Sequence, residues 1–245
     1  MGVGVSGFVD PSSGVDLFSP VLGWRNVPLR DALRERLRLP TWVENDVNAL
    51  ALAELWYGAG RAFRHFVVIT VGEGVGAGVV IDGEVYRGAF GGAGEVGHVT
   101  INPDGPTCRC RERGCLEVYA SDRFLLEEAS RLGFASLDAM MAAARDGGAD
   151  ARGVFSRMGA YLGLGAKDIV NLLNPEAIVL GGERMDAADL FLSAFQEAVV
   201  RHSFPSLADH LQVVPGALGE DGFLIGPAAL VAADFFHVPA AGGAP

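Results

Sequence analysis

All three cysteines of this 245-residue chain lie within eight positions, at Cys108, Cys110 and Cys115. The Cys-x-Cys-x4-Cys spacing leaves an odd thiol after any disulfide, so cross-linking does not explain the cluster. Zinc prefers four sulfur or nitrogen ligands in a tetrahedron, and His98, ten residues upstream, can supply the fourth. Because four protein ligands close the site, the pattern predicts a structural Zn²⁺ that pins the loop and does not activate water. Three unrelated thiols beside a chance histidine are the alternative.

Two carboxylates flank this loop, Glu95 before His98 and Glu117 just after Cys115. If His98 binds a metal through one ring nitrogen, the other nitrogen can donate to a ligand oxygen. We therefore expect Glu95, His98 and Glu117 to form a polar rim suited to a small polyol. Ordinary solvated surface is the alternative for both glutamates.

Alternating glycines at Gly72, Gly74, Gly76 and Gly78 follow an apolar run over 66–71. Such a backbone can approach an anion closely, which is a weak phosphate signal. The segment does not open a helix, so neither the Rossmann fingerprint nor the P-loop applies. A tight hairpin is the other interpretation.

The segment Glu44-Asn45-Asp46 ends an expected strand and starts an expected helix. Asp46 can serve as a helix N-cap. Alternatively its carboxylate lies at the C-terminal end of a strand, where open α/β sheets bind ligands. There it can accept the proton of a sugar hydroxyl that attacks phosphorus.

Apolar runs bounded by glycine and proline alternate with helical patterns, which predicts an α/β fold. We expect Asn26 and Ser121 each to cap a helix, and Asp82-Gly83 to turn a hairpin. The other expected strands cover 3–5, 42–44, 66–71, 78–86, 177–180 and 211–214, and the other expected helices 46–57, 151–173, 188–200 and 226–236.

Charge and hydropathy exclude two classes of partner. The formal net charge is −11, from 30 acidic and 19 basic residues, whereas phosphate neutralisation needs a basic surface. Apolar runs long enough to span a bilayer are absent from the sequence. We expect a cytoplasmic protein that contacts neither nucleic acid nor membrane directly.

Taken together, these segments resemble the ROK family of repressors, open reading frames and kinases. The resemblance runs in family order over nearly the whole chain, and its most specific element is the histidine with three cysteines followed by a glutamate. The matching stretches are 4–10, 22–25, 44–46, 72–78, 94–98, 108–117 and 174–182.

The resemblance implies an actin-like (ribonuclease H-like) ATPase fold, with two α/β lobes around a cleft. Residues 1–45 would be the remainder of the small N-terminal lobe, completed by the C-terminal helix 222–236. Residues 46–221 would form the large lobe with its zinc-binding loop, and 237–245 a frayed tail. The family also suggests a homodimer or tetramer.

The same resemblance implies roles for individual residues. A hexose or pentose would be gripped by Asn45, Asp46, Glu95, His98 and Glu117. Asp46 matches the catalytic base of the family. Zinc would be bound by His98, Cys108, Cys110 and Cys115. The ATP-binding segments of the family would include Gly74, Gly76, Gly181 and Gly182.

Two departures from the family matter. Its opening strand hairpin, with an Asp-x-Gly-x-Thr phosphate loop, would precede Met1, so we expect an N-terminally truncated chain with an incomplete first lobe. Arg111 occupies the position after the second zinc cysteine, where the family usually has glycine, so we expect a slightly different turn there.

Two features favour the regulators of this family over its kinases. Kinases usually carry a small hydroxyl residue at the position of Glu73, and a carboxylate facing phosphate there is repelled by roughly 4 kcal/mol at about 4 Å. The run over 102–121 looks most like xylose- and glucose-type repressors. The leading hypothesis is therefore a sugar-binding effector module of a transcriptional regulator.

The alternative is an ATP-dependent, glucokinase-like hexose kinase that uses Mg²⁺, with Asp46 as general base. A remnant that folds around zinc and binds nothing is the third possibility.

Overall fold

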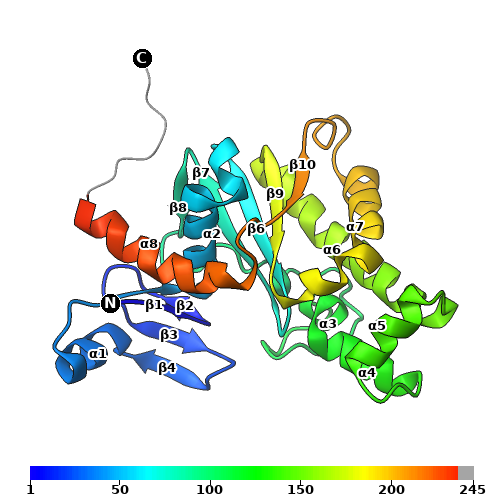
Figure 1. Cartoon of the computed structure of the whole chain (residues 1–245), viewed down its shortest axis with the longest axis horizontal. Coiled ribbons are helices and arrows are strands. Elements are labelled where there is room, and N and C mark those ends of the chain that lie inside the picture. The colour runs from blue at the N-terminus through cyan, green and yellow to red at the C-terminus, as the bar shows by residue number, and fades with distance from the viewer. Residues whose placement is uncertain (237–245) are drawn as a thin grey trace.

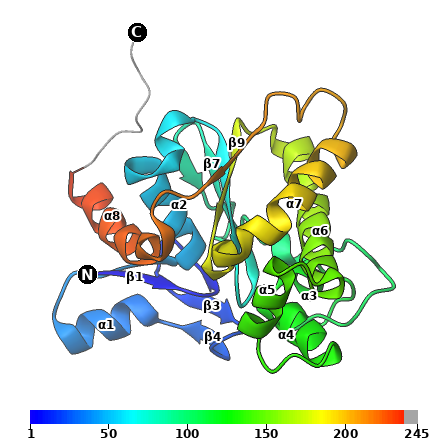
Figure 2. The ribbon, with the colours of Figure 1, turned by 45° about the vertical axis from the view of Figure 1, so that its right-hand side comes forward.

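The computed structural model describes residues 1–236, which form three sheets surrounded by helices (Figures 1 and 2). The largest sheet has five strands in the order β10-β9-β6-β7-β8. Strands β10, β9 and β6 run parallel, and β7 and β8 continue the sheet antiparallel. This confirms the α/β class. The five strands are β6 (Phe66–Val71), β7 (Val75–Ile81), β8 (Glu84–Tyr86), β9 (Ala177–Gly181) and β10 (Gln212–Pro215).

Strand β6 lies at the centre of this sheet, and all six of its residues are buried. Because successive side chains point to opposite faces, the side chains of β6 pack in two hydrophobic cores, one on each face of the sheet. Val67 and Ile69 pack in the core formed with α6 (Ala149–Leu173) and α7 (Ala188–His202). Phe66 and Val68 pack on the other side, with helix α2 (Asp46–Tyr57).

Helix α2 crosses β7 at its glycines. A Cβ added at Gly78 would lie 2.7 Å from the Ala51 Cβ and 2.8 Å from the Val47 carbonyl oxygen. A Cβ at Gly76 would lie 3.0 Å from a methyl group of Val47. These glycines therefore let α2 approach the sheet closely, and α2 carries Asp46 at its first turn.

The first 45 residues form two small sheets and one helix, which lie below α8 and the lower end of α2 in Figure 1. Strands β1 (Gly2–Val5) and β5 (Trp42–Asn45) are parallel, and β2 (Phe8–Val9), β3 (Asp16–Ser19) and β4 (Trp24–Val27) are antiparallel. Helix α8 (Gly222–Phe236) packs on α2, β1 and β5, so the two ends of the described chain meet. The predicted tail 237–245 lies outside the described residues, and the predicted lobe boundary at 45–46 stays a prediction.

Helices α3 (Glu117–Ala120), α4 (Asp122–Arg131) and α5 (Leu137–Arg145) complete the layer beside α6. The remaining elements are α1 (Leu29–Leu37) and the 3₁₀ turns η1 (Ala59–Ala62), η2 (Val96–His98), η3 (Glu183–Ala187) and η4 (Gly219–Asp221). Among residues 1–236, none of the helices combines the length and the hydropathy needed to cross a bilayer.

Several local expectations need correction. Asn26 does not cap a helix: it lies in β4 with φ 51°, and α1 begins after Pro28 without a side-chain cap. Ser121 is the N-cap residue of α4, but its side chain makes no capping hydrogen bond. The predicted Asp82-Gly83 turn is confirmed, with φ 54° and 76°. The sequence patterns did not predict β2, β3, β4 or α5.

Candidate functional site

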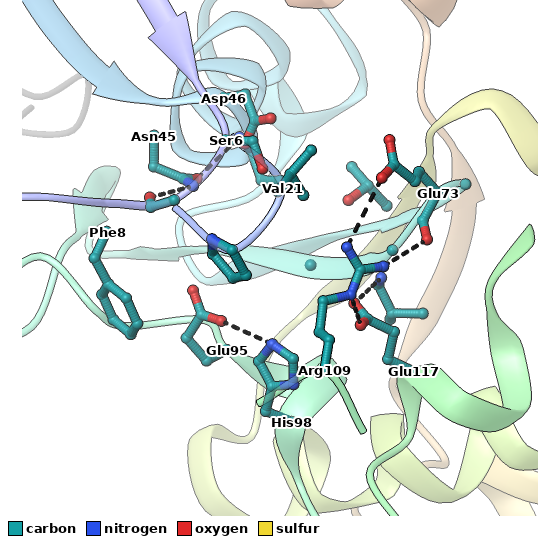
Figure 3. A pocket seen from close by; sticks show the side chains of 18 of the residues that line it. Ser6, Phe8, Val21, Asn45, Asp46, Glu73, Glu95, His98, Arg109 and Glu117 are labelled. Carbon is teal, nitrogen blue, oxygen red and sulfur yellow. Dashed lines mark hydrogen bonds and ion pairs between the residues drawn. The ribbon is translucent and has the colours of Figure 1, made fainter. Parts of the chain in front are cut away.

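A cavity of about 300 Å³ lies where the β5–α2 turn faces the β6–β7 hairpin and the loop that carries the cysteines (Figure 3). We call it the polar cavity, because its described walls include five carboxylates: Asp46, Glu73, Glu95, Glu117 and Glu183. All five predicted sugar ligands line it, namely Asn45, Asp46, Glu95, His98 and Glu117. The structure thus brings together residues that are up to 72 positions apart in the chain.

The Asn45-Asp46 turn begins helix α2. Asn45, not Asp46, is the N-cap: its Oδ1 accepts hydrogen bonds from the backbone N–H groups of Val47 and Asn48, at 2.9 and 3.0 Å. Its Nδ2 donates one hydrogen bond to the Gly7 carbonyl oxygen at 3.1 Å, and an amide nitrogen can donate two. Asp46 Oδ1 accepts from the Val47 N–H at 2.9 Å. Burial raises the pKa of Asp46, and the Glu183 charge adds to this rise.

Glu95 and His98 flank the short turn η2. The Nε2 of His98 lies 3.8 Å from a Glu95 carboxylate oxygen, so this ring nitrogen faces Glu95 (Figure 3). Burial raises the pKa of Glu95; the His98 charge opposes this rise, and the charges of Glu117 and Asp46 add to it. Both groups line the polar cavity, where they can bind hydroxyls of a ligand.

Glu117, the first residue of α3, is buried, so the solvated-surface alternative is wrong for it. Its Oε1 lies 2.7 Å from the Arg109 Nε, and its Oε2 accepts the Val75 N–H at 3.3 Å. Arg109 also donates from Nη2 to the Glu73 carbonyl oxygen at 3.1 Å (Figure 3). The carboxylate is thereby fixed between the cysteine loop and the β6–β7 hairpin. A Cβ at Gly74 would lie only 2.7 Å from Glu117 Oε2, so a side chain at this position would displace the carboxylate.

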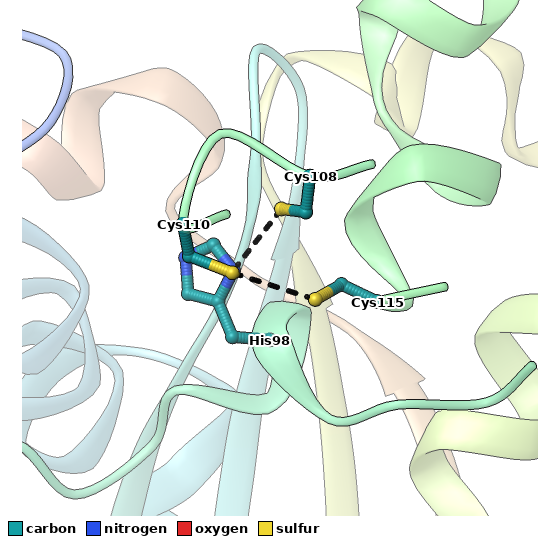
Figure 4. A group of neighbouring side chains, drawn as sticks. All are labelled: His98, Cys108, Cys110 and Cys115. Carbon is teal, nitrogen blue, oxygen red and sulfur yellow. Dashed lines mark hydrogen bonds between the residues drawn. The ribbon is translucent and has the colours of Figure 1, made fainter. Parts of the chain in front are cut away.

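The imidazole and the three thiols form one cluster (Figure 4). Their four ligand atoms lie within 4.8 Å of one another. The Cys108 Sγ is 3.5 Å from His98 Nδ1, and the Cys110 Sγ is 3.6 Å from Cys115 Sγ. In a tetrahedron with metal–sulfur bonds of about 2.3 Å, neighbouring sulfurs lie about 3.8 Å apart, so the spacing suits zinc.

The donor chemistry also suits a cation. Burial raises the pKa of Cys108 and Cys115, that of Cys115 to about 12. Packed thiols of this kind ionise at neutral pH only when a positive charge such as Zn²⁺ compensates them. Nδ1 of His98 faces the sulfurs while Nε2 faces the cavity, so one side chain can serve a metal and a ligand together. Zinc itself stays a prediction.

Arg111, the departure within this loop, has φ 80°, in the left-handed region that favours glycine.

The glycine segment is a tight hairpin, as the second interpretation held. Val71 pairs with Val75, and the Gly72 N–H donates to the Gly74 carbonyl oxygen at 3.0 Å. Of the predicted nucleotide residues, Gly74 and Gly76 line the polar cavity, whereas Gly181 and Gly182 are not among its described lining residues. Their role toward a nucleotide stays a prediction.

Glu73 is placed less unfavourably for an anion than its sequence position suggests. It borders the cavity, but its side chain is 75% exposed and its Oε1 lies 3.8 Å from Arg109 Nη1. Water and the guanidinium both screen this charge, so the repulsion of roughly 4 kcal/mol predicted from sequence overstates the effect.

Sequence reasoning missed two charged residues of the cavity, Arg109 and Glu183. Arg109 lies between two cysteines that were expected to share a metal, which was the available signal that its position is fixed. Glu183 follows Gly181-Gly182 directly, and its carboxylate lies where a Cβ of Gly72 would be, 1.8 Å from that point.

Comparison with known proteins agrees with this architecture. The family model described as "ROK family" matches residues 1–234. A xylose repressor of Caldicellulosiruptor bescii is 33% identical over 98% of this chain, which spans 64% of the repressor's length. A ROK family glucokinase from Streptomyces griseus, solved with glucose and AMPPNP, superposes with a TM-score of 0.85 at 35% identity, covering 94% of this chain and 80% of that one.

A ROK family transcriptional regulator, a homologue of the E. coli MLC protein, superposes with a TM-score of 0.84 at 31% identity. The superposition covers 93% of this chain and 61% of the regulator's chain. The fold is therefore the predicted actin-like fold, and both repressors and sugar kinases share it with this protein. The chain belongs to the ROK family.

Proposed function

We propose that the polar cavity binds a sugar. The observation that carries this proposal is the convergence of Asn45, Asp46, Glu95, His98 and Glu117 on one space of about 300 Å³. A sugar hydroxyl both donates and accepts hydrogen bonds, and these walls offer carboxylate acceptors together with an amide and an imidazole donor. Each carboxylate can accept hydrogen bonds from more than one hydroxyl, and its negative charge repels an anion. The site therefore suits a neutral polyol better than an anion.

We further propose that His98, Cys108, Cys110 and Cys115 hold a structural Zn²⁺. The ion would fix the cysteine loop, and with it the orientation of the His98 ring toward the cavity. All four ligand positions would be filled by protein, so the ion would contribute to stability and not to chemistry.

The role that we favour is that of a sugar-binding effector module of a transcriptional regulator. Glu73 lies in the turn of the β6–β7 hairpin and the Glu183 carboxylate lies against Gly72 of the same turn, so both add negative charge where a nucleotide would bring its phosphates. Arg109 and water screen part of the Glu73 charge, which leaves Glu183 as the stronger argument. Sugar binding would shift the population of a closed arrangement and so the state of a dimer or tetramer. The net charge of −11 argues against direct contact of this chain with nucleic acid.

Calorimetry tests this proposal with glucose, xylose and N-acetylglucosamine, each with and without ATP and Mg²⁺. We expect micromolar-to-millimolar binding of at least one sugar, and no release of ADP in a coupled assay. Sugar-dependent ADP release would refute the effector role, whereas lack of binding by any sugar would refute the site itself.

The second candidate function is an ATP-dependent sugar kinase, and the position of Asp46 supports it. The carboxylate lies at the start of α2, lines the polar cavity, and has a pKa raised by burial, as suits a general base. Asp46 would take the proton of the attacking hydroxyl while that oxygen bonds to the γ-phosphorus and the bond to the leaving ADP breaks. ATP with Mg²⁺ would supply the phosphoryl group.

For that candidate, Asp46→Asn should abolish turnover while sugar affinity stays within about threefold, because the amide keeps hydrogen-bonding capacity but is no base. Equal losses of turnover and affinity would contradict the general-base role.

A further inference from the structure

A second hollow opens beside the polar cavity, and we call it the aromatic groove. Its volume is about 450 Å³. Four aromatic side chains, Phe8, Phe18, Tyr86 and Phe90, line it together with Leu17 and the loop 88–93. Its described walls contain no charged side chain, whereas the walls of the polar cavity include five carboxylates.

The groove and the polar cavity share two walls, Phe8 and Phe18. Figure 3 shows Phe8 on the Glu95 side of the polar cavity, away from Glu73 and the β6–β7 hairpin. A substituent that passes Phe8 or Phe18 on that side would leave the carboxylate-lined space for an aromatic one.

Two of the aromatic walls, Phe8 and Phe18, pack against neighbouring residues. The Phe8 ring packs on Gly92, where an added Cβ would lie 2.1 Å from the ring. The Arg25 guanidinium stacks 4.4 Å from the centre of the Phe18 ring. These two rings are thus fixed, whereas Phe90 is 81% exposed at the rim and has apolar surface still to cover.

We propose that the ligand of this protein is a sugar with an apolar, planar substituent, such as an aryl group, that binds in the aromatic groove while the sugar ring occupies the polar cavity. The inference rests on the proposed sugar site and adds the substrate class. A planar substituent suits the groove because aromatic rings pack well in offset or edge-to-face contact. A free hexose would leave the groove, and Phe90 with it, uncovered.

The test compares ligand pairs that differ only in the planar group: methyl with phenyl β-D-glucoside, and N-acetyl- with N-benzoylglucosamine. Two attachment points are used so that the sugar's orientation need not be assumed. In at least one pair we expect the phenyl-bearing member to bind about tenfold tighter by calorimetry, from the added apolar burial.

Phe90→Ala should remove most of this difference and leave the affinity for the methyl or acetyl partner unchanged. Phe90 is exposed at the rim, so the substitution spares the fold. Phe204→Ala is the matched control, because Phe204 is also exposed, at 68%, and lines neither hollow.

Equal affinities within both pairs would overturn the inference, and so would a phenyl preference that survives Phe90→Ala. In both cases binding of the methyl glucoside, the acetyl sugar or free glucose would show that the sugar site itself is intact. Failure of every sugar to bind would overturn the sugar site and this inference together.

Discussion

Removing the Arg109 side chain tests whether the cysteine loop holds the Glu117 carboxylate in place. Arg109 is flanked by two proposed metal ligands, so its backbone position is fixed independently of its side chain. Its guanidinium reaches Glu117 Oε1 at 2.7 Å and the Glu73 carbonyl oxygen at 3.1 Å. Arg109→Ala removes both contacts and the weaker ion pair with the Glu73 carboxylate at 3.8 Å. Among residues 1–236, the buried Glu117 carboxylate then keeps the Val75 N–H as its hydrogen-bond donor.

The expected cost follows from burial. Removing one partner of a fully buried ion pair costs about 3–5 kcal/mol, because the other charge stays desolvated. The Arg109 side chain is 26% exposed, so in the variant water can enter the space it leaves and partly solvate the unpaired Glu117 carboxylate. We therefore expect Arg109→Ala to lower the free energy of unfolding by about 2 kcal/mol. Sugar affinity should fall as well, because Glu117 is no longer oriented.

Urea denaturation and sugar calorimetry measure the two effects, with Arg113→Ala as the control. Arg113 belongs to the same loop but is exposed, and within residues 1–236 its side chain donates to the Asp104 carbonyl oxygen, at 3.4 Å. Arg109→Lys should recover part of the stability but less of the affinity, since an ammonium lacks the guanidinium fork. A loss below about 0.5 kcal/mol for Arg109→Ala, or equal losses for both arginines, would refute the reasoning.

Four further predictions follow from single contacts. Glu54 accepts the N–H groups of Ala59, Ala217 and Leu218, so Glu54→Ala should cost about 2–4 kcal/mol of unfolding free energy in urea and Glu54→Gln clearly less; equal effects would contradict this role. Because burial raises the pKa of Asp46, the folded state binds this proton more tightly than the unfolded state, and the stability gained from the protonated form is lost as pH rises through the folded-state pKa. Asp46→Asn should therefore be more stable than the wild type at pH 7 and equally stable near pH 3. A stability difference that is independent of pH would count against this reasoning. Arg111→Gly should raise the free energy of unfolding by up to about 1 kcal/mol, because it relieves the positive φ, and a destabilised variant would show that the arginine side chain matters more. Chelation should remove one zinc per chain, seen by elemental analysis, and lower the melting temperature by about 10 °C, whereas a metal-free chain with unchanged melting would exclude the proposed ion.

Motifs that are local in sequence were the predictable part of this molecule. Helix 46–57 and strand 66–71 match their predicted bounds, because buried apolar runs and capping residues act within a few positions. The strands β2, β3 and β4 were missed because each is only two to four residues long and partly exposed. They pair with one another as consecutive antiparallel strands, Phe8 with Phe18 and Phe18 with Arg25, so their partners lie close in the chain. What the segment lacks is an alternating apolar pattern long enough to indicate strands this short.

Contacts across the polar cavity were not predictable, because they join segments that meet only in the fold. Arg109 reaches Glu73 over 36 positions, and no periodicity of the sequence links the two. The glycines of β7 show the same limit in another way. Gly76 and Gly78 suggest phosphate contact from spacing alone, yet both also admit α2 to the sheet, and only the helix position reveals that second function.

The choice between sensor and kinase depends on one half of the cavity, since the other half serves both. In the proposed site, a sugar would be bound whether or not a phosphoryl group arrives, by Asn45, Asp46, Glu95, His98 and Glu117. The opposite half is the β6–β7 hairpin, where Glu73 and Glu183 add negative charge and Arg109 offsets part of it. Any ATP bound there would have to bring Mg²⁺ to offset these carboxylates as well as its own phosphates. If Glu73→Ser with Glu183→Gln created measurable ADP release where the wild type shows none, charge at the hairpin would be what separates the two activities. If both proteins stayed inactive while binding sugar, the barrier to catalysis would lie elsewhere in the molecule.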